Sequence, residues 1–479
     1  MEDAAGTSAN GDASEPPNST AALPRLVEIT DAGDVVLDCV FENSKATLKS
    51  AKKQQAASRI ATGQQPSSSA PVLRARARVG FRVELAVLRL NSKYFDRMLG
   101  DTRFKEAKTI EAAFHALSLR QADPGSAPVG DLPWVRIVDD DQETRLAHRE
   151  EALGDMLRLL HGKEVANPAP TLDFAATLAV LADRFDCAPA VSKAIASGGL
   201  KIKWPVTQRK TPLTEDSKMS RSLENALRQK VLVSWLLNQP QRFQAATREL
   251  IMSGSVKWSS FREQDDGGDE AIWWYLPDGI EQELQYRREC VLNTIASVPR
   301  HFVSLYISRA RQCKLGYDSS AACDSYQLGE TIKFLSTKNL FFLVDFSPNS
   351  LNLIADTSML HIDTILATLR QCTAYQIDKH HTNCGLRTRM MPILDFLKAL
   401  LSTSSVPLSR LPWRNDRQRI AWLPSEDELQ DVTLQQDKPF QFTRGMQSDQ
   451  RLRFEHAMGA EKFARDVFTA SSWNWSAED

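Results

Sequence analysis

The chain has 479 residues, of which 42% are hydrophobic and 25% are charged, and these ordinary globular values fit two or three domains. Its formal net charge of -1 excludes an overall field that would draw the protein to nucleic acid or to a membrane surface. The longest apolar runs, such as residues 340–344, are far too short to span a bilayer.

The seven cysteines and the N-terminal composition predict the compartment. An odd number of widely scattered cysteines is typical of reduced thiols rather than of a disulfide framework. The first residues are acidic, small and polar, so we predict neither a secretory signal nor a transit peptide. We therefore expect a cytoplasmic or nuclear protein that does not enter a membrane.

The N-terminal region begins with a segment that we expect to be disordered, residues 1–24, because it has few large apolar side chains. A turn at Gly33-Asp34 precedes a predicted strand at residues 35–41. Residues 44–71 are rich in Lys, Gln, Ala and Ser, and we interpret them as a long, disordered insert between two strands.

A second strand begins near Val72 and carries Arg74, Arg76 and Arg78 in alternation with small apolar residues. A period of two puts the three guanidinium groups on one face of the strand. They form either a basic ribbon for an anionic partner or the solvent face of a half-buried strand. Three arginines in a neutral protein favour the solvent face.

Helical and strand patterns alternate over the next hundred residues. Residues 85–99 have helical apolar spacing, and residues 134–138 form a short predicted strand that ends in the acidic run 139–141. We expect that run to be a solvated turn, because consecutive carboxylates diverge. Apolar stripes then predict helices at residues 150–161 and 172–187.

The second half of the chain is predicted to be helical. We expect a linker at 206–221, an α-helical domain at 222–428 and a loosely ordered tail at 429–479. The helices predicted inside it are 222–237, one that opens at Pro240, one after an Asp278-x-x-Glu281 capping-box variant, 302–311, 357–369 and 392–401.

The N-terminal pattern resembles a BTB/POZ domain over roughly residues 30–200. The order is strand, strand, amphipathic helix, short strand and helix pair, and we place this domain at residues 25–205. The resemblance implies an α+β fold of short strands and helical hairpins. The matching residues are Gly33-Asp34-Val35, Phe81-Arg82-Val83, Leu88, Ser92, Tyr94-Phe95, Met98-Leu99 and Phe104-x-Glu106.

The resemblance also implies a function, because BTB/POZ domains are protein-interaction modules. Family members self-associate, bridge cullin-type ubiquitin ligases to substrates or recruit corepressors. The whole chain resembles BTB-like proteins of filamentous fungi with a long helical C-terminal half. It departs from the pattern at Val83-Glu84-Leu85, where a polar residue is usual, and in its long insert. The residues expected to contact a partner are Leu88, Tyr94, Phe95, Met98 and Phe104.

Four residues of the C-terminal half have the chemistry of a metal site. Cys313 and Cys323 are followed much later by His381 and Cys384, whose spacing lets two ligands turn back onto one ion. Zinc favours four such nitrogen and sulfur ligands in a structural site. A Cys3His site with Cys372 as a substitute ligand is one interpretation, and free cysteines buried in a helical core are the other.

The motif inventory favours a non-catalytic protein. The sequence contains no Gly-x-Ser-x-Gly, Walker A, Gly-x-Gly-x-x-Gly or His-Glu-x-x-His motif, and no small-molecule substrate is evident. The leading hypothesis is an adaptor that binds protein partners. The alternatives are a DNA-associated regulator, based on the arginine face and on Arg209 and Lys210, and last a zinc enzyme around Asp378, His380 and His381.

Two groups of aromatic residues have competing interpretations. Trp273-Trp274-Tyr275 is either an anchor for a partner or, more commonly, core packing beside a loop. Trp473 and Trp475 lie in the tail that we expect to be loosely ordered, where they are candidates for a short linear motif.

Overall fold

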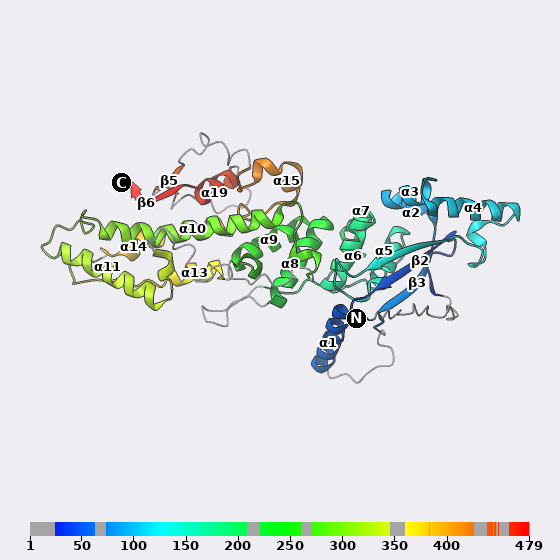
Figure 1. The fold of residues 1–479 in the computed structure, drawn as a ribbon. Helices are drawn as coiled ribbons and strands as arrows, with labels where there is room; N and C mark the ends of the chain where they lie inside the picture. Colours follow the sequence, from blue (N-terminus) through cyan, green and yellow to red (C-terminus); the bar gives the residue numbers. More distant parts are fainter. Residues whose placement is uncertain are drawn as a thin grey trace, which may run out of the picture.

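The structure is a computed structural model, and it confirms the α+β class, with a four-stranded sheet, a two-stranded sheet and many helices. The sheet and its helices lie at one end of an elongated molecule, and the long helices extend to the other (Figure 1). The structure describes residues 24–62, 73–207, 221–259, 270–344, 360–382, 384–425, 438–443, 445–446, 449 and 459–478. All but the last residue of the expected N-terminal tail lies outside these ranges.

The main sheet has four strands in the order β1-β3-β2-β4. Strand β2 pairs antiparallel with β3 and parallel with β4, so that Leu37 lies between Phe81 and Val135. Strand β1 pairs parallel with β3 and was absent from the sequence prediction, since it has only four residues. Seven of the eight residues of β2 are buried, as expected for a central strand covered on both faces. The strands are β1 (Arg25–Glu28), β2 (Val35–Glu42), β3 (Arg76–Val83) and β4 (Trp134–Asp140).

The predicted disordered insert at 44–71 is wrong for most of its length. Residues Lys45–Thr62 form helix α1, and only residues 63–71 of the insert lie outside the described part of the chain. Ser44 begins the helix, because its Oγ accepts a hydrogen bond from the Thr47 backbone N–H at 3.2 Å. Lysine, alanine and glutamine are strong helix formers, and they explain a helix without an apolar stripe.

The single helix predicted at 85–99 is two helices separated at Ser92. Ser92 has an extended backbone, and its hydroxyl accepts from the Phe95 N–H and donates to the Phe185 carbonyl. Helix α4 and helix α7, which follows Cys187, were not predicted. The helices of this end are α2 (Leu85–Asn91), α3 (Lys93–Gly100), α4 (Lys105–Leu119), α5 (Arg149–Leu160), α6 (Leu172–Arg184) and α7 (Ala188–Ala196), with a short 3-10 turn η1 (Pro124–Ser126).

The acidic run after β4 is not the solvated turn that we expected. Asp139 is buried and accepts hydrogen bonds from the guanidinium groups of Arg149, at 2.6 Å, and of Arg184. Asp141 is also buried and accepts from the Ser44 backbone N–H at 2.8 Å. These carboxylates are structural, since buried charges need charged or hydrogen-bonding partners.

The helical half packs directly on the N-terminal end. The Gln229 amide of α8 donates to the Asp173 carboxylate of α6 at 2.8 Å, and the Ile272 N–H donates to the Glu143 carbonyl at 2.7 Å. Apolar residues of both regions belong to one continuous buried cluster. Most of the predicted linker, residues 208–220, lies outside the described residues. The first elements of this half are α8 (Arg221–Leu236), α9 (Pro240–Ser253), η3 (Val256–Trp258) and η4 (Ile272–Trp274).

One 28-residue helix, α10 (Ile280–Ile307), runs through the helical half (Figure 1). It joins two segments that the sequence separated, and Pro299 lies inside it. The predicted capping box is wrong, because the residue before the helix is Gly279 in a left-handed conformation. Asp278 instead accepts a hydrogen bond from the Trp235 indole N–H at 2.9 Å.

Shorter helices pack beside α10. They are α11 (Ser320–Thr337), η5 (Phe341–Val344), α13 (Ile362–Leu369), α14 (Leu386–Ser402), α15 (Arg410–Asn415) and α16 (Arg417–Ile420). Within the residues that the structure describes, no helix combines the length and apolar character needed to cross a bilayer.

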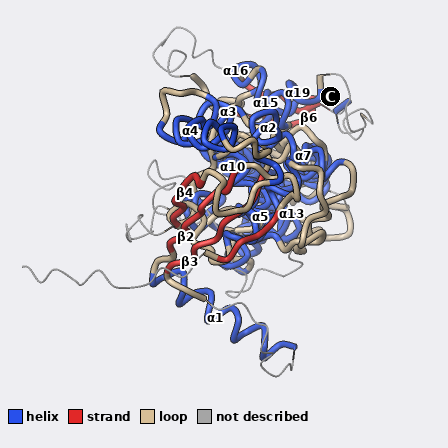
Figure 2. Tube along the Cα trace, turned by 90° about the vertical axis from the view of Figure 1, so that its right-hand side faces the viewer, coloured by secondary structure: helices blue, strands red, loops and turns tan. Residues whose placement is uncertain are grey.

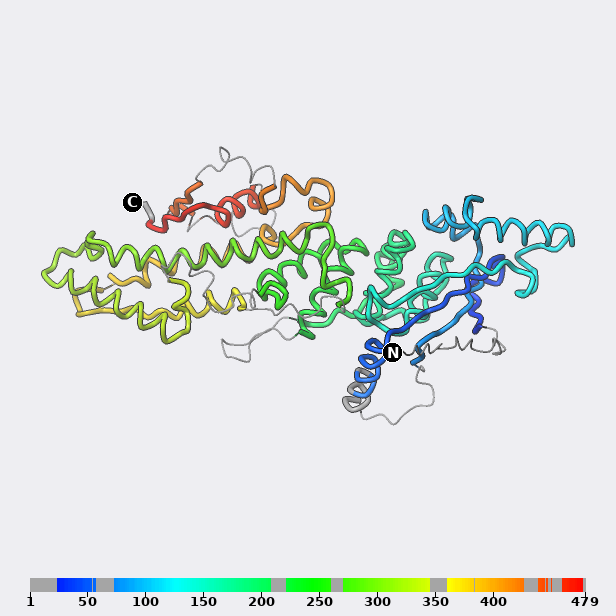
Figure 3. The backbone as a smooth tube through the Cα atoms, viewed as in Figure 1, coloured from blue at the N-terminus to red at the C-terminus, as the bar shows by residue number. Residues whose placement is uncertain are grey.

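The C-terminal segment is packed rather than loosely ordered, so that prediction is wrong for its described residues. Strands β5 (Pro439–Thr443) and β6 (Ser472–Glu478) pair in parallel, and helix α19 (Ala460–Phe468) precedes β6. Figure 3 shows this segment lying along α10. Trp475 is only 1% exposed, and its indole N–H donates to Ser297 of α10 at 2.8 Å. A buried tryptophan cannot serve as an exposed linear motif.

His301 makes the docking of the C-terminal segment sensitive to pH. Its Nε2 lies 3.0 Å from the Ser476 hydroxyl, and burial lowers its pKa from 6.5 to about 4. Between these two pH values the His301 imidazole binds a proton in the unfolded chain but not in the folded chain. The free energy of unfolding therefore falls as the pH drops from 6.5 to about 4. We expect His301→Gln to flatten that part of the stability curve in urea titrations at each pH. An unchanged curve would contradict this role of His301.

Candidate metal centre and interaction surface

Three separate segments bring Cys313, Cys323, His381 and Cys384 together. Cys313 lies between α10 and α11, and Cys323 lies in the first turn of α11. His381 and Cys384 lie in the connection between α13 and α14. One ligand atom from each of the four residues lies within 4.8 Å of the other three. The four residues predicted from sequence therefore form one cluster.

The distances in the cluster are close to those of tetrahedral coordination, and one sulfur pair is closer together than two thiolates on a zinc ion would be. The Sγ atoms of Cys384 and Cys313 lie 3.2 Å apart, and those of Cys384 and Cys323 lie 3.6 Å apart. His381 Nδ1 lies 3.5 Å from Cys313 Sγ. Four ligand atoms bound to one zinc ion at 2.0–2.3 Å would lie about 3.5–3.8 Å from one another. The donor set and its spacing can therefore hold one metal ion.

The imidazole of His381 is oriented by a residue outside the cluster. Its Nδ1 faces the sulfur atoms, and its Nε2 lies 2.8 Å from the Ser319 hydroxyl. Metal-binding histidines usually donate the other ring N–H to such an acceptor, which fixes the tautomer. The His381 side chain is buried. Ser319 was not predicted, although a serine just before a helix is a signal for a capping or anchoring role.

The environment of the cysteines favours a thiolate at Cys313. Burial opposes its ionisation, but hydrogen bonds from the Ser320 hydroxyl and the Leu315 backbone N–H outweigh burial and lower its pKa to about 7. Burial raises the pKa of Cys323 and of Cys384. The loop that carries Cys313 is held by Asp324, whose carboxylate accepts from the N–H groups of Gln312 and Cys313 at 2.8 Å each.

The other candidate ligands lie outside the cluster. Cys372 is buried elsewhere, its Sγ is 3.7 Å from the Thr373 carbonyl, and burial raises its pKa to about 11. It is therefore not the substitute ligand that we considered. His380 is exposed and packs against the ring of Tyr317, while Asp378 accepts hydrogen bonds from the N–H groups of His380 and His381.

The predicted interaction residues divide into core and surface. Leu88 and Phe95 are completely buried, so the prediction that they contact a partner is wrong. Tyr94 is 39% exposed and Phe104 is 44% exposed, and with the half-buried Met98 they line a hollow of about 600 Å³. The apolar pattern identified the helix but not which of its faces is covered, which is the face where Phe95 stacks on Phe185. The hollow is also lined by Lys93, Arg97, Glu106, Arg184 and Asp186.

The arginine face of β3 is largely neutralised. Arg78 donates two hydrogen bonds to the Asp38 carboxylate, at 2.7 and 2.8 Å, and Arg76 lies 3.7 Å from Glu42. Both acidic residues lie on the neighbouring strand β2. Arg74 is exposed, but one arginine is a weak basis for a binding ribbon, so the solvent-face interpretation fits.

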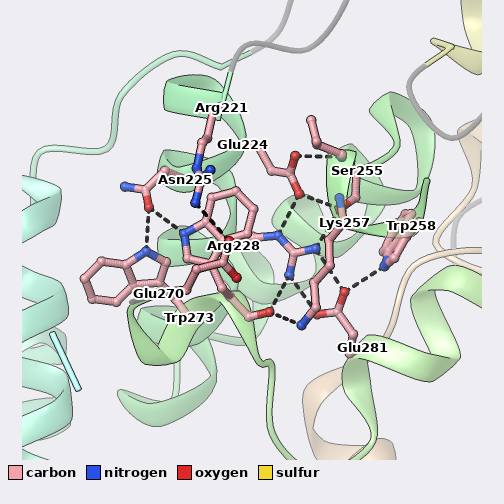
Figure 4. Close-up of polar contacts among 12 residues, drawn as sticks. Arg221, Glu224, Asn225, Arg228, Ser255, Lys257, Trp258, Glu270, Trp273 and Glu281 are labelled. Carbon is pink, nitrogen blue, oxygen red and sulfur yellow. Dashed lines mark hydrogen bonds and ion pairs between the residues drawn. The ribbon is translucent and has the colours of Figure 1, made fainter. Parts of the chain in front are cut away.

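A buried ionic network connects α8 with α10 (Figure 4). Arg228 Nε donates to Glu224 at 2.8 Å, and its two terminal nitrogens donate to the Glu281 carboxylate at 2.7 and 2.9 Å. Ser255 and Trp258 complete the hydrogen bonding of the two carboxylates. Because the charged groups are paired, the network is structural. The i, i+4 spacing of Glu224 and Arg228 was the signal for it in the sequence.

The tryptophans beside this network belong to the core, as the commoner interpretation expected. Trp273 and Trp274 are buried, and both indole N–H groups donate to the Asn225 side chain at 2.7 and 3.0 Å. Tyr275 is 46% exposed and lies beside Lys257. The two tryptophans therefore cannot form an exposed anchor.

Comparisons with known proteins leave the family open. No protein-family description, no curated protein and no solved structure matches the chain. The function is therefore argued from the geometry of the described residues.

Proposed function

We propose that the protein is a non-catalytic adaptor whose N-terminal α+β end binds a protein partner. The observation that carries the proposal is the hollow beside α3 and the start of α4, where Tyr94, Met98 and Phe104 remain accessible. Exposed aromatic and methionine side chains in a concave site are typical of protein interfaces. The BTB/POZ resemblance supports the same proposal, since β2, β3, α2 with α3, β4 and the pair α5 and α6 follow the order that it implies, with β1, α1 and α4 as additions to that order.

The composition of the hollow suggests the chemistry of the partner. Apolar Tyr94, Met98 and Phe104 share its lining with cationic Lys93 and Arg97 and with anionic Glu106 and Asp186. A lining of this mixed character fits a peptide segment or helix that inserts one apolar side chain and pairs with both signs of charge. We propose either a second copy of the chain or a cullin-type scaffold as the partner.

We further propose that the Cys3His cluster binds a structural zinc ion. Four protein ligands complete a tetrahedral shell and leave no position for a substrate, which distinguishes a structural from a catalytic site. Bound zinc would join the start of α11 to the connection between α13 and α14. One zinc per chain is expected in metal analysis of the purified protein, and clearly sub-stoichiometric zinc would overturn the proposal.

The hollow is tested with two matched charge substitutions in full-length protein. Phe104→Glu places a charge at the apolar centre, whereas Leu119→Glu places one at the opposite end of α4, on a side chain that is 74% exposed. We expect Phe104→Glu to weaken binding at least 100-fold, the effect of losing an aromatic anchor. Leu119→Glu should bind like the wild type.

The measurements are light scattering for self-association and binding assays with purified cullin-type scaffold. A wild-type chain that stays monomeric and binds no scaffold would refute the adaptor proposal. Equal behaviour of the two variants and the wild type would show that binding uses another surface. Circular dichroism of each variant checks that α4 remains folded.

A further inference from the structure

Helix α1 stands away from the body of the molecule in two perpendicular views (Figures 1 and 2). Hydrogen bonds nevertheless fix the N-terminal end of the helix. The Ser44 N–H donates to the buried Asp141, and the Asn43 side chain accepts from Arg149 at 2.9 Å and donates to the Arg74 carbonyl at 2.8 Å. The direction in which the helix leaves the sheet is therefore set by hydrogen bonds to the buried residues Asp141 and Arg149 and to the backbone of Arg74.

The projecting helix presents a stripe of lysines. Lys45, Lys49, Lys52 and Lys53 are all exposed, and their i, i+4, i+7, i+8 spacing puts them on one face. The sequence of α1 contains no acidic residue. Among the described residues, none forms an ion pair with these four lysines. The positive charge of this face is thus uncompensated, although the whole chain is close to neutral.

An uncompensated row of cations on a projecting helix can bind an anionic partner with repeated charges. A membrane-surface helix also needs a continuous apolar face, and Leu48 and Ile60 are the only large apolar residues in α1. The rows of phosphates on duplex DNA match a polar helix better, because an α-helix fits the major groove and lysines neutralise phosphates.

We propose that the lysine stripe of α1 binds the phosphate backbone of duplex DNA without sequence specificity. The near-zero net charge of the whole chain argued against binding to nucleic acid. That value does not reveal the local excess of positive charge, which the fold places on α1. The contact is independent of the adaptor surface, since the hollow beside α3 is lined by other residues. Four phosphate contacts predict that a fourfold rise in salt weakens binding roughly 100-fold.

The proposal is tested by fluorescence anisotropy of a labelled 20-base-pair duplex with full-length protein in 50 and 200 mM salt. The test variant replaces Lys45, Lys49, Lys52 and Lys53 with glutamine, which keeps a similar helix propensity. The control variant makes the same change in charge at four exposed lysines of the same end, Lys163, Lys193, Lys201 and Lys203.

We expect the α1 variant to lose at least tenfold in affinity at 50 mM salt. The slope of log affinity against log salt concentration should fall by about one for each lysine replaced. The control variant should retain most of the binding. Absence of wild-type binding at 50 mM salt, or equal losses in the two variants, would overturn the proposal. Tighter α1-dependent binding to vesicles rich in phosphatidylserine than to DNA would also overturn it, in favour of a membrane surface.

Discussion

Replacing Cys323 with serine is expected to abolish binding of the zinc ion that we propose and to destabilise the far end of the helical half by about 4 kcal/mol or more. The site joins segments that are far apart in sequence, so much of the binding free energy of zinc becomes folding free energy. Hydrogen exchange followed by mass spectrometry should show faster exchange in the start of α11 and in residues 372–385. The four-stranded sheet should exchange as before.

Two control variants separate metal binding from general damage to the core. Cys372→Ser alters a buried cysteine outside the cluster and should keep one zinc per chain. Ser319→Ala removes the hydroxyl beside His381 Nε2 and should weaken zinc binding about 10–100-fold in competition with a chelator. Zinc content that is unchanged in Cys323→Ser would remove that residue from the ligand set.

Replacing Arg228 with methionine is expected to cost about 3–5 kcal/mol of stability at neutral pH. The substitution leaves the carboxylates of Glu224 and Glu281 buried without their shared cation. Against the effect of burial, Arg228 holds the pKa of Glu281 below its usual value, so that pKa should then rise, and the loss should shrink as the pH falls and Glu281 binds a proton. Urea titration followed by tryptophan fluorescence measures the loss, because Trp258 donates to Glu281.

The same network offers its own rescue experiment. A triple variant with Arg228→Met, Glu224→Gln and Glu281→Gln should recover most of the stability, because the amides carry no buried charge and their oxygens still accept from Ser255 and Trp258. Arg419→Met, which breaks an exposed pair with Asp416, should change stability by less than about 1 kcal/mol. A single Arg228→Met variant as stable as the wild type would contradict the structural role of the network.

Apolar periodicity predicted the helices and strands that bury one regular face in the core. It failed for elements that bury few side chains or have no apolar face. The strand at 35–41 and the helices at 150–161 and 172–187 were recognised because their apolar spacing is regular. Helix α1 has no apolar stripe, and only its helix propensity could have revealed it. The C-terminal strands were missed because the surrounding sequence is largely polar, although Phe440 and Phe442 alternate as strand residues do.

The candidate metal site shows what spacing can and cannot predict. Soft ligands in two distant pairs identified Cys313, Cys323, His381 and Cys384, since few other residue types bind zinc in structural sites. Sequence could not exclude Cys372, because its position relative to the cluster depends on how α13 and α14 pack. Nor could it assign Nδ1 as the facing nitrogen of His381, which depends on the placement of Ser319.

The single helix α10 sets the distance between the α8 network at its start and the Cys3His cluster near its end. Glu281 at its start belongs to the network that connects it to α8, and its end lies six residues before Cys313. Its 28 residues span about 42 Å. In the adaptor that we propose, this helix would keep a molecule bound at the sheet end at a fixed distance from the Cys3His cluster and would set their mutual orientation.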